Sequence, residues 1–250
     1  MYPYDFFTQY RVDNLIDRIF VGMWFNEEHK LRFDNIIVKA IDQSKLKPYR
    51  VDQPVSGDSI PINILEGILN SRIVLFDVSY ITPEIVLKDS AKKRFRNANV
   101  MYELGLAHAW RLPEEIIVIR DDTDQLPFDI TAFRVHTYNP IDIVGSIEQI
   151  SRIIKDAGIE INRAKSIIVE RAAKSLDSRC LAFMHDNRGH YFSEPQYNSI
   201  VADTINRFLN LGILLLDTSG GGGSYAYHWT ELGRDVMKYF GIQLHPKELA

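Results

Sequence analysis

The chain has 250 residues, of which 46% are hydrophobic, 11% aromatic and 25% charged, the balance of an ordinary folded protein. This composition excludes disordered, collagen-like and coiled-coil architectures, and the length allows one large domain or a core domain with a smaller one. The 29 Lys and Arg residues against 33 Asp and Glu residues give a net charge of −4, too close to neutral to indicate a polyanion as the main partner.

The numbers and positions of cysteine, histidine and apolar residues indicate which metal sites and which cellular compartment to expect. Cys180 is the single cysteine, which excludes an internal disulfide and a Cys-rich metal site. His185 and His190 flank Asp186 without a third ligand, so no metal site is expected. The first 20 residues have no secretory pattern, and no window reaches the ~18 uninterrupted apolar residues of a membrane helix. We therefore expect a cytoplasmic protein without a membrane partner.

Short β-branched runs alternate with longer segments of helical period in the first part of the chain. Two of the runs, 73–78 and 116–119, are almost entirely apolar, as parallel strands covered on both faces must be. The alternation predicts an α/β domain with a flavodoxin-like five-stranded parallel sheet. The expected strands are Ile19–Met23, Tyr49–Val51, Ile73–Val78, Ile116–Ile119 and Phe133–Tyr138.

The segments between these runs carry apolar residues at helical spacing. Asn99 stands where a side-chain oxygen would cap the start of the third helix. The expected helices are Glu28–Ile41, Ile60–Leu69, Val100–Trp110 and Ile141–Ala157.

The rest of the chain follows a different order of elements, and the segment Gly158–Arg163 is the expected boundary. Helix, helix, hairpin, helix is the order of a winged-helix α+β domain, with the four glycines 220–223 at the tip of the wing. The predicted division is an N-terminal extension 1–18, an α/β domain 19–157 and a winged-helix-like domain 164–250. The elements expected in the last domain are Ser166–Met184, Glu194–Leu211, Leu214–Asp217, Tyr225–Thr230 and Glu231–Phe240.

A winged helix commonly binds DNA, but the charge of this one does not favour that partner. From Lys165 onward nine Lys and Arg residues balance nine Asp and Glu residues, and the segment Glu194–Leu211 offers Arg207 as its single cation. Because phosphate neutralisation supplies much of the affinity for DNA, we favour a protein partner or self-association through residues 164–250. DNA binding is the alternative.

Ligands of open parallel sheets bind at the carboxyl ends of the strands. Asp77 ends the third expected strand, and Glu103 lies about one turn inside the helix that follows. The helix dipole also explains a glutamate at that place, but the small residues Gly105 and Ala107 indicate a helix that approaches the sheet closely. We expect the two carboxylates to border one crevice, an arrangement that suits cleavage of a glycosidic bond. Other polar segments at this edge are Met23–Asn26, Asp52–Ser59, Arg120–Asp122 and Asn139.

Four sequence blocks in order resemble the bacterial TIR-like nucleotide-binding domains related to nucleoside 2-deoxyribosyltransferases. The resemblance covers about Ile19 to Tyr138, and Leu126–Ile130 with the strand after it is similar to the closing segment of these domains. The blocks are Phe20–Phe25, Ser56–Ile60, Ile73–Ser79 and Asn99–Ala109.

The resemblance implies an enzyme that cleaves the N-glycosidic bond of a nucleoside, a nucleotide or NAD⁺, with no cofactor besides that substrate. It implies that Glu103 is the catalytic carboxylate and that Asp77 binds the sugar or positions the substrate. Such domains often serve as nucleotide-depleting effectors in antiviral defence, frequently as assemblies, and others are known only as binding modules. The expected substrate-binding residues are Gly22, Met23, Trp24, Phe25, Ser56, Gly57, Asp58, Ser59, Asn99 and Tyr102.

The segment Tyr80–Ala98 departs from the family pattern, because relatives have almost no chain between the aspartate strand and the glutamate helix. It suits a basic lid over substrate phosphates, an assembly surface or a solvated excursion, and it can displace Asn97 and Asn99 from their roles in relatives. Its cations are Lys88, Lys92, Lys93, Arg94 and Arg96.

The nicotinamide of NAD⁺ is already cationic, so it leaves without a general acid and a single carboxylate suffices. For this reason the leading prediction is an N-glycosidase acting on NAD⁺ or a related nucleotide. Two alternatives stay open: a regulator that binds a nucleotide without turnover and uses its winged helix on DNA or protein, and a nucleoside 2-deoxyribosyltransferase. Residue patterns do not choose between water and another acceptor.

Overall fold

The computed structural model describes residues 15–51, 60–81, 85–86, 92–126, 134–189, 191–193, 199–217 and 226–245. The chain divides into two compact units, Met1–Ile161 and Asn162–Ala250. Several sequence predictions lie outside the described residues: the extension before residue 15, the Ser56–Ser59 loop, Lys88 and the four glycines 220–223.

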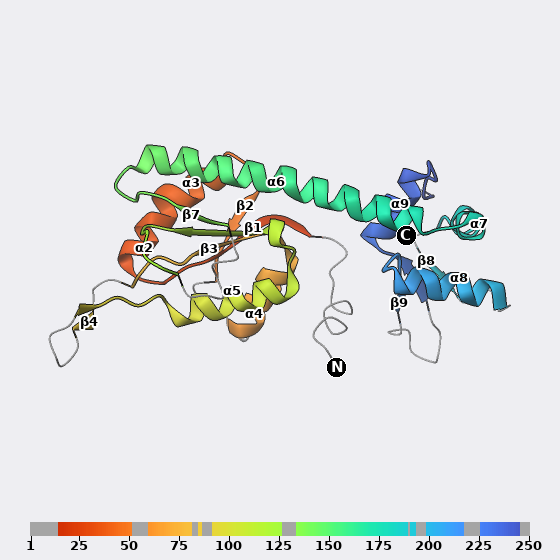
Figure 1. The fold of residues 1–250 in the computed structure, drawn as a ribbon, viewed down its shortest axis with the longest axis horizontal. Helices are drawn as coiled ribbons and strands as arrows, with labels where there is room; N and C mark the ends of the chain where they lie inside the picture. Colours follow the sequence, from red (N-terminus) through yellow and green to blue (C-terminus); the bar gives the residue numbers. More distant parts are fainter. Residues whose placement is uncertain are drawn as a thin grey trace. The chain divides into compact units, whose positions relative to one another are not determined.

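The first unit is built on a five-stranded parallel sheet in the order β2-β1-β3-β6-β7 (Figure 1). In chain order this is 2-1-3-4-5, the flavodoxin-like order, so the expected α/β architecture is confirmed. The first strand begins at Ile16 and not at Ile19. The strands are β1 (Ile16–Gly22), β2 (Lys47–Tyr49), β3 (Ser71–Asp77), β6 (Ile116–Arg120) and β7 (Val135–Thr137).

Helices cover both faces of this sheet (Figure 1). Side chains of β3 alternate between the faces: Leu75 is buried on one and Phe76 on the other. The face covered by α2, η1, α3 and α6 is called the α6 face, and the face covered by α4 and α5 is called the α5 face. These elements are α2 (Glu27–Arg32), the π-helical turn η1 (Phe33–Ile37), α3 (Val38–Asp42), α6 (Ile143–Lys174), α4 (Ile60–Asn70) and α5 (Ala98–Trp110).

Asn97 caps α5, so the prediction that Asn99 does so is wrong. The Asn97 side chain accepts hydrogen bonds from the backbone N–H groups of Asn99, at 2.9 Å, and Val100, at 3.2 Å. Asn97 has the extended backbone of an N-cap (φ −66°, ψ 120°). Asn99 is already inside the helix, where its own N–H is one of the groups that need a cap.

The predicted boundary at Gly158–Arg163 is not a break in the helix. α6 continues through it, and its apolar residues enter two separate cores. Ile150 and Ile154 lie in the core of the first unit, whereas Ala172 and Ala173 lie in the core of the second. Glycine inside a helix costs about 1 kcal/mol relative to alanine, which burial on both sides of Gly158 offsets.

The predicted helix Ser166–Met184 is two helices. α6 ends at Lys174, and α7 (Ser178–Asp186) begins after Asp177. The Asp177 carboxylate accepts from the backbone N–H groups of Arg179 and Cys180, each at 3.0 Å. An aspartate cap of this kind starts a new helix, because its side chain replaces the missing intrahelical acceptors.

The insertion forms an antiparallel β-ribbon. β4 (Ile85–Val86) pairs with β5 (Lys92–Lys93), and nearer the sheet Tyr80 forms a bridge with Arg96. The Ile81 N–H donates to the Phe95 carbonyl at 2.7 Å. The described residues 80–81, 85–86 and 92–96 are called the ribbon below. The ribbon ends one residue before the Asn97 cap of α5.

The second unit combines helices with a three-stranded antiparallel sheet in the order β8-β10-β9. Its buried core includes Met184, Phe208 and Trp229, and the Trp229 indole N–H donates to the Asn187 carbonyl at 2.8 Å. β8 was not expected from the sequence, and the assignment to the winged-helix class stays a prediction. The elements after α7 are β8 (Tyr191–Ser193), α8 (Ser199–Asn210), β9 (Leu214–Asp217), β10 (Ala226–Trp229) and α9 (Glu231–Tyr239).

Among the helices of the described residues, none combines the length and the apolar character needed to cross a membrane.

The assignment of the α5 cap predicts a difference between two asparagines. Asn97→Ala is expected to lower the free energy of unfolding by about 1 kcal/mol, because the first N–H groups of α5 lose their acceptor. Asn99→Ala is expected to lower it by less than about 0.5 kcal/mol. Urea unfolding followed by circular dichroism compares the two variants, and equal losses would contradict the assignment.

Candidate active site

The carboxyl end of β1 lies at the point where the strand order reverses. β1 stands between β2 and β3, so the chain crosses from one side of β1 to the other. Gly22 ends β1 and is paired with Phe76 of β3. In flavodoxin-like sheets ligands bind outside the carboxyl ends of the strands at this switch point.

Glu103 lies at the switch point, on the α5 face. A Cβ atom added to Gly22 would lie 3.0 Å from Glu103 Oε2 and 2.5 Å from the Phe76 ring. The glycine therefore leaves the room that the carboxylate occupies beside the strand end. α5 is fixed against this face by three buried side chains, Val100, Leu104 and Ala107.

The Glu103 carboxylate is half-buried without a neutralising contact. No residue that the structure describes donates a hydrogen bond to it or forms an ion pair with it, and burial raises the pKa of Glu103 to about 7. Near neutral pH the group is present both as the acid and as the carboxylate. A perturbed, unpaired titratable group at a ligand-binding edge is a typical candidate for catalysis.

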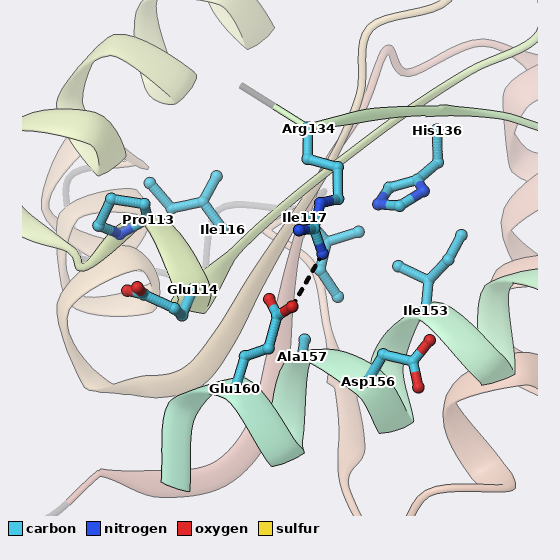
Figure 2. Close-up of a pocket in the computed structure, with 10 residues that line it drawn as sticks. All are labelled: Pro113, Glu114, Ile116, Ile117, Arg134, His136, Ile153, Asp156, Ala157 and Glu160. Carbon is cyan, nitrogen blue, oxygen red and sulfur yellow. Dashed lines mark hydrogen bonds and ion pairs between the residues drawn. The ribbon is translucent and has the colours of Figure 1, made fainter. Parts of the chain in front are cut away.

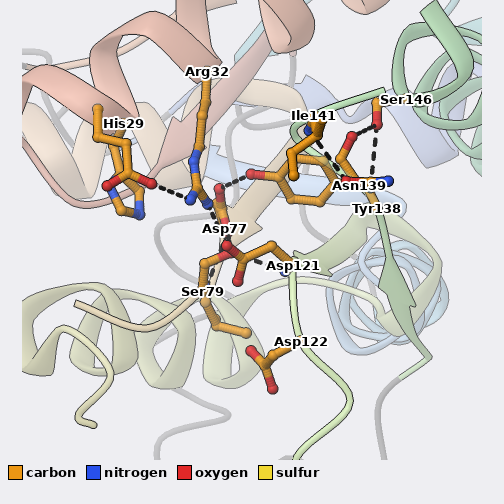
Figure 3. A network of polar contacts seen from close by, with 12 residues as sticks. His29, Arg32, Asp77, Ser79, Asp121, Asp122, Tyr138, Asn139, Ile141 and Ser146 are labelled. Carbon is orange, nitrogen blue, oxygen red and sulfur yellow. Dashed lines mark hydrogen bonds and ion pairs between the residues drawn. The ribbon is translucent and has the colours of Figure 1, made fainter. Parts of the chain in front are cut away.

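Asp77 does not join Glu103. It follows Leu75 in the strand alternation, so its side chain lies on the α6 face, and it is 2% exposed. Its carboxylate accepts from the backbone N–H and the hydroxyl of Ser79 and, at 2.7 Å, from the Tyr138 hydroxyl (Figure 3). The prediction that both carboxylates border one crevice is therefore wrong, because the sheet lies between them.

Asp77 belongs to a buried polar network that ties the strand ends to α2 (Figure 3). The Asp121 N–H, after β6, donates to the Ser79 hydroxyl at 3.0 Å. The Asp121 carboxylate accepts from Arg32 at 2.7 Å, and Arg32 also pairs with Glu28. A satisfied network of this kind holds its members in one arrangement, so these contacts point to a structural role.

His29 and Arg32 are buried polar residues near Asp77 that the sequence analysis missed. Arg32 lies three residues after His29 and four before the buried Ile36, so the three share one stripe of the helix. That spacing was the available signal. His29 Nδ1 lies 2.8 Å from the Asn26 side-chain oxygen, and its ring is 5.2 Å from that of Trp24. Burial lowers the pKa of His29, although the charge of Asp77 opposes this shift.

The residues expected to bind substrate divide into core and surface. Met23 is 1% exposed and lies in the core on the α6 face, so the expectation that it lines a pocket is wrong. Trp24 is half-buried, and Asn99 is exposed at the start of α5. Phe25 is 51% and Tyr102 69% exposed. Aromatic rings exposed to this degree are available for stacking on a nucleobase.

A cavity of about 330 Å³ lies at the opposite, amino-terminal edge of the sheet (Figure 2). Ile116 and Ile117, at the start of β6, form its apolar floor, beside the short turn η2 (Pro113–Glu115). Arg134 and Glu160 pair across it at 2.9 Å, and both are largely exposed. An exposed pair contributes little energy, and the cavity is at the edge away from Glu103.

Metal chemistry has no candidate ligands in the described ranges. No three His, Cys, Asp or Glu side chains among them are grouped so as to hold an ion. His185 and Asp186 form an exposed contact of 3.5 Å. At the switch point the described side chains include the Glu103 carboxylate, aromatic rings and the guanidinium of Arg50, which lies 5.2 Å from the Phe25 ring centroid.

Comparison with known proteins finds a distant structural likeness. No family model and no curated protein sequence matches the chain. Among solved structures, the chain is similar to the TIR domain of the Toll-related receptor TRR-2 from the lower metazoan Hydra magnipapillata. The identity is 14%, the match covers 56% of this chain and 96% of that one, and the TM-score is 0.39. A likeness this distant carries no argument about activity, so the fold rests on the strand order above.

The raised pKa of Glu103 predicts a pH-dependent stability. Between pH 4.5 and about 7, Glu103 is protonated in the folded protein but ionised in the unfolded chain. Raising the pH through this range therefore favours the unfolded chain, and the free energy of unfolding of the wild type falls. Relative to Glu103→Gln, the wild-type free energy of unfolding is expected to fall by on the order of 2 kcal/mol from pH 5 to pH 8, after discounting partial exposure.

Denaturant unfolding at pH 5 and at pH 8 measures this difference. Glu148→Gln is the matched control, because Glu148 is an exposed helical glutamate of the same unit. Parallel pH dependences for the wild type and Glu103→Gln would show that Glu103 has an ordinary pKa.

The Asp77 network predicts a cost for losing one hydroxyl. Tyr138→Phe leaves a buried Asp77 oxygen without its donor, so the free energy of unfolding is expected to fall by about 1–3 kcal/mol. Tyr102→Phe, which removes a hydroxyl from a ring that is 69% exposed, is expected to change it by less than about 0.5 kcal/mol. Thermal unfolding of the two variants tests the contrast, and similar effects would refute the structural role of the Asp77 contact.

Proposed function

We propose that the chain is an N-glycosidase that cleaves the base–ribose bond of NAD⁺ or a related nucleotide, with Glu103 as its catalytic carboxylate. The observation that carries the proposal is the half-buried Glu103 carboxylate, unpaired among the described residues, beside Gly22 at the β1–β3 switch point. The four sequence blocks that resemble TIR-like nucleotide-binding domains support it independently, because the last block contains this glutamate.

Breaking the bond between C1′ and nitrogen leaves both electrons on the departing nicotinamide, which becomes neutral. Positive charge develops on the ribose, and the ionised Glu103 stabilises it or attacks C1′. Water then adds to C1′ and loses a proton; where Glu103 has attacked, its bond to C1′ breaks in this step and the carboxylate is released. NAD⁺ and water become nicotinamide, ADP-ribose and a proton, so atoms and charges balance.

The lack of a described counter-charge favours a cationic substrate. Burial alone raises the pKa of Glu103 to about 7, which means that its ionised form is destabilised in the free protein. A nicotinamide cation near the carboxylate restores the ionised form, because opposite charges lower the pKa of a carboxylate. A neutral nucleobase gives no such attraction and requires the protonated acid to assist its departure.

The second unit is proposed to bind a protein partner or a second copy of this chain. Three of its cations already pair with carboxylates of the same unit, which leaves less charge for DNA. The pairs are Lys165–Glu231 at 2.8 Å, Arg207–Asp177 at 3.1 Å and Lys174–Glu170 at 2.5 Å. A cytoplasmic effector of antiviral defence that acts by nucleotide depletion, as the sequence resemblance implies, is consistent with such a sensing unit.

Chromatography of NAD⁺ incubated with the protein tests the proposal. Nicotinamide release is expected for the wild type and for Glu148→Gln, and Glu103→Gln is expected to lower it roughly 10²–10⁴-fold. For NAD⁺, kcat/KM is expected to rise with pH around pH 7, since the ionised form of Glu103 acts and this ratio reports the free enzyme.

Other outcomes would favour the alternatives. Nucleotide binding without base release, together with a salt-sensitive DNA complex, indicates a regulator. Release that requires a second nucleobase indicates a deoxyribosyltransferase. A nucleotide photocrosslinked to the cavity lined by Arg134 and Glu160, at the other edge of the sheet, would overturn the site assignment.

A further inference from the structure

A buried ion pair joins the ribbon to the sheet immediately before α5. Arg96 and Asp122 form two parallel contacts, Nη1 to Oδ2 at 3.1 Å and Nη2 to Oδ1 at 2.9 Å. The two side chains are 7% and 8% exposed. Two bonds between a planar guanidinium and a carboxylate fix direction as well as distance.

Arg96 contacts the ends of two strands at once. Besides Asp122, which follows β6, it donates to the carbonyl of Val78, which follows β3. The Tyr80 ring lies 4.3 Å from the guanidinium and covers it. Arg120, the last residue of β6, is 3.3 Å from the same Asp122 oxygen that Arg96 Nη2 contacts. The start of α5 is thereby tied to the carboxyl edge of β3 and β6.

The neighbouring cation of the ribbon is held differently. Arg94 pairs with Asp124 at 2.6 Å, and these side chains are 44% and 46% exposed. An exposed pair is screened by water and orders its surroundings weakly, whereas a buried pair is strongly disrupted when one partner is removed. Arg96 is therefore the anchor of the insertion, whereas Arg94 is held weakly at the surface.

In the first turn of α5 the apolar anchor is Val100, with the partly buried Met101 packed beside it. Ala98 and Asn99 are exposed, and Val100 is the first residue of the helix that is buried. Leu104 and Ala107 anchor the helix only beyond Glu103. The depth at which Glu103 sits against Gly22 therefore depends on Val100 and on the contacts that fix the chain before it.

We propose that Arg96, through its paired contact with Asp122, is a positioning residue that holds the start of α5 against the sheet and so keeps Glu103 beside Gly22. The effect of Arg96 on the position of Glu103 rests on the contacts described above. The effect of that position on catalysis rests on the proposed function. Loss of the clamp lets the first turn move away from the sheet and gives the carboxylate access to water.

The ionisation of Glu103 reports this movement directly. Its side-chain carboxyl signal is followed by ¹³C NMR against pH in the full chain labelled on glutamate, with Glu103→Gln identifying the signal. In the wild type, burial raises the pKa of Glu103 to about 7. In Arg96→Gln the pKa is expected to fall by about one unit or more, toward that of an ordinary glutamate, because burial is lost.

The direction of the pKa shift of Glu103 distinguishes a movement of the helix from the simple loss of a positive charge. Removing a cation without moving the helix raises the pKa of a nearby carboxylate or leaves it unchanged. A fall in the pKa therefore supports the proposal, and an unchanged or raised pKa overturns it. Arg94→Gln, which removes the exposed cation two residues away, is the matched control and is expected to leave the pKa of Glu103 within about 0.3 unit.

Two further variants keep the test decisive if Arg96→Gln does not fold. Asp122→Asn keeps the size of the partner but removes its charge, and Arg96→Lys keeps the cation but loses the planar fork. In whichever of these folds by circular dichroism, the pKa of Glu103 is expected to fall. A folded variant with the wild-type pKa overturns the proposal.

Turnover distinguishes this inference from the proposed function. If both hold, Arg96→Lys lowers kcat for nicotinamide release by about 10-fold or more and changes KM less, because the substrate still binds while the carboxylate is misplaced. If Glu103→Gln retains turnover while the clamp variants shift the pKa of Glu103, the proposed function fails and the positioning role stands. An unchanged pKa defeats the positioning role whatever the turnover.

Discussion

A carboxylate held partly out of water with no described counter-charge is the constraint on which the rest of the first unit depends. Glu103 occupies space beside the end of β1 that exists because residue 22 has no side chain. Burial of such a group opposes folding at neutral pH, as its raised pKa shows. The helix that carries it must therefore be fixed to the sheet by other contacts, and these are the apolar residues of the α5 face and the Arg96–Asp122 pair.

The two faces of the sheet differ in how their buried carboxylates are hydrogen-bonded. On the α6 face, Asp77 has three hydrogen bonds, and its network extends through Ser79 and Asp121 to Arg32. On the α5 face, Glu103 has no such contact with a described residue. Satisfied buried groups stabilise one arrangement, whereas an unsatisfied one retains its capacity to interact with a ligand. Under the proposed function, the chemistry therefore falls to one carboxylate and not to a pair.

The insertion and α6 show how charged and apolar residues join parts of the chain. The cations Arg94 and Arg96 were open to three interpretations in the sequence, and their aspartate partners Asp122 and Asp124 come from beyond β6. α6 continues through the segment expected to separate two domains, because its residues up to Ile161 are buried in the first core and Ala172 and Ala173 in the second. In both cases the partner lies far away in sequence, and local composition does not reveal it.

The sequence by itself determined the five strands and the helices of the first unit, because strands buried on both faces need continuous apolar runs and amphipathic helices need apolar residues at helical spacing. The close approach of helix to sheet that Gly105 and Ala107 predicted is only half right. Ala107 is buried against the sheet, whereas Gly105 is exposed and a Cβ atom added there would meet nothing within 4 Å. The tertiary structure alone decided that Asp77 and Glu103 lie on opposite faces. Crossovers between parallel strands are right-handed, so the strand order determines which face of the sheet each helix covers. It also decided between Asn97 and Asn99 as the cap, because the ribbon fixes where α5 begins.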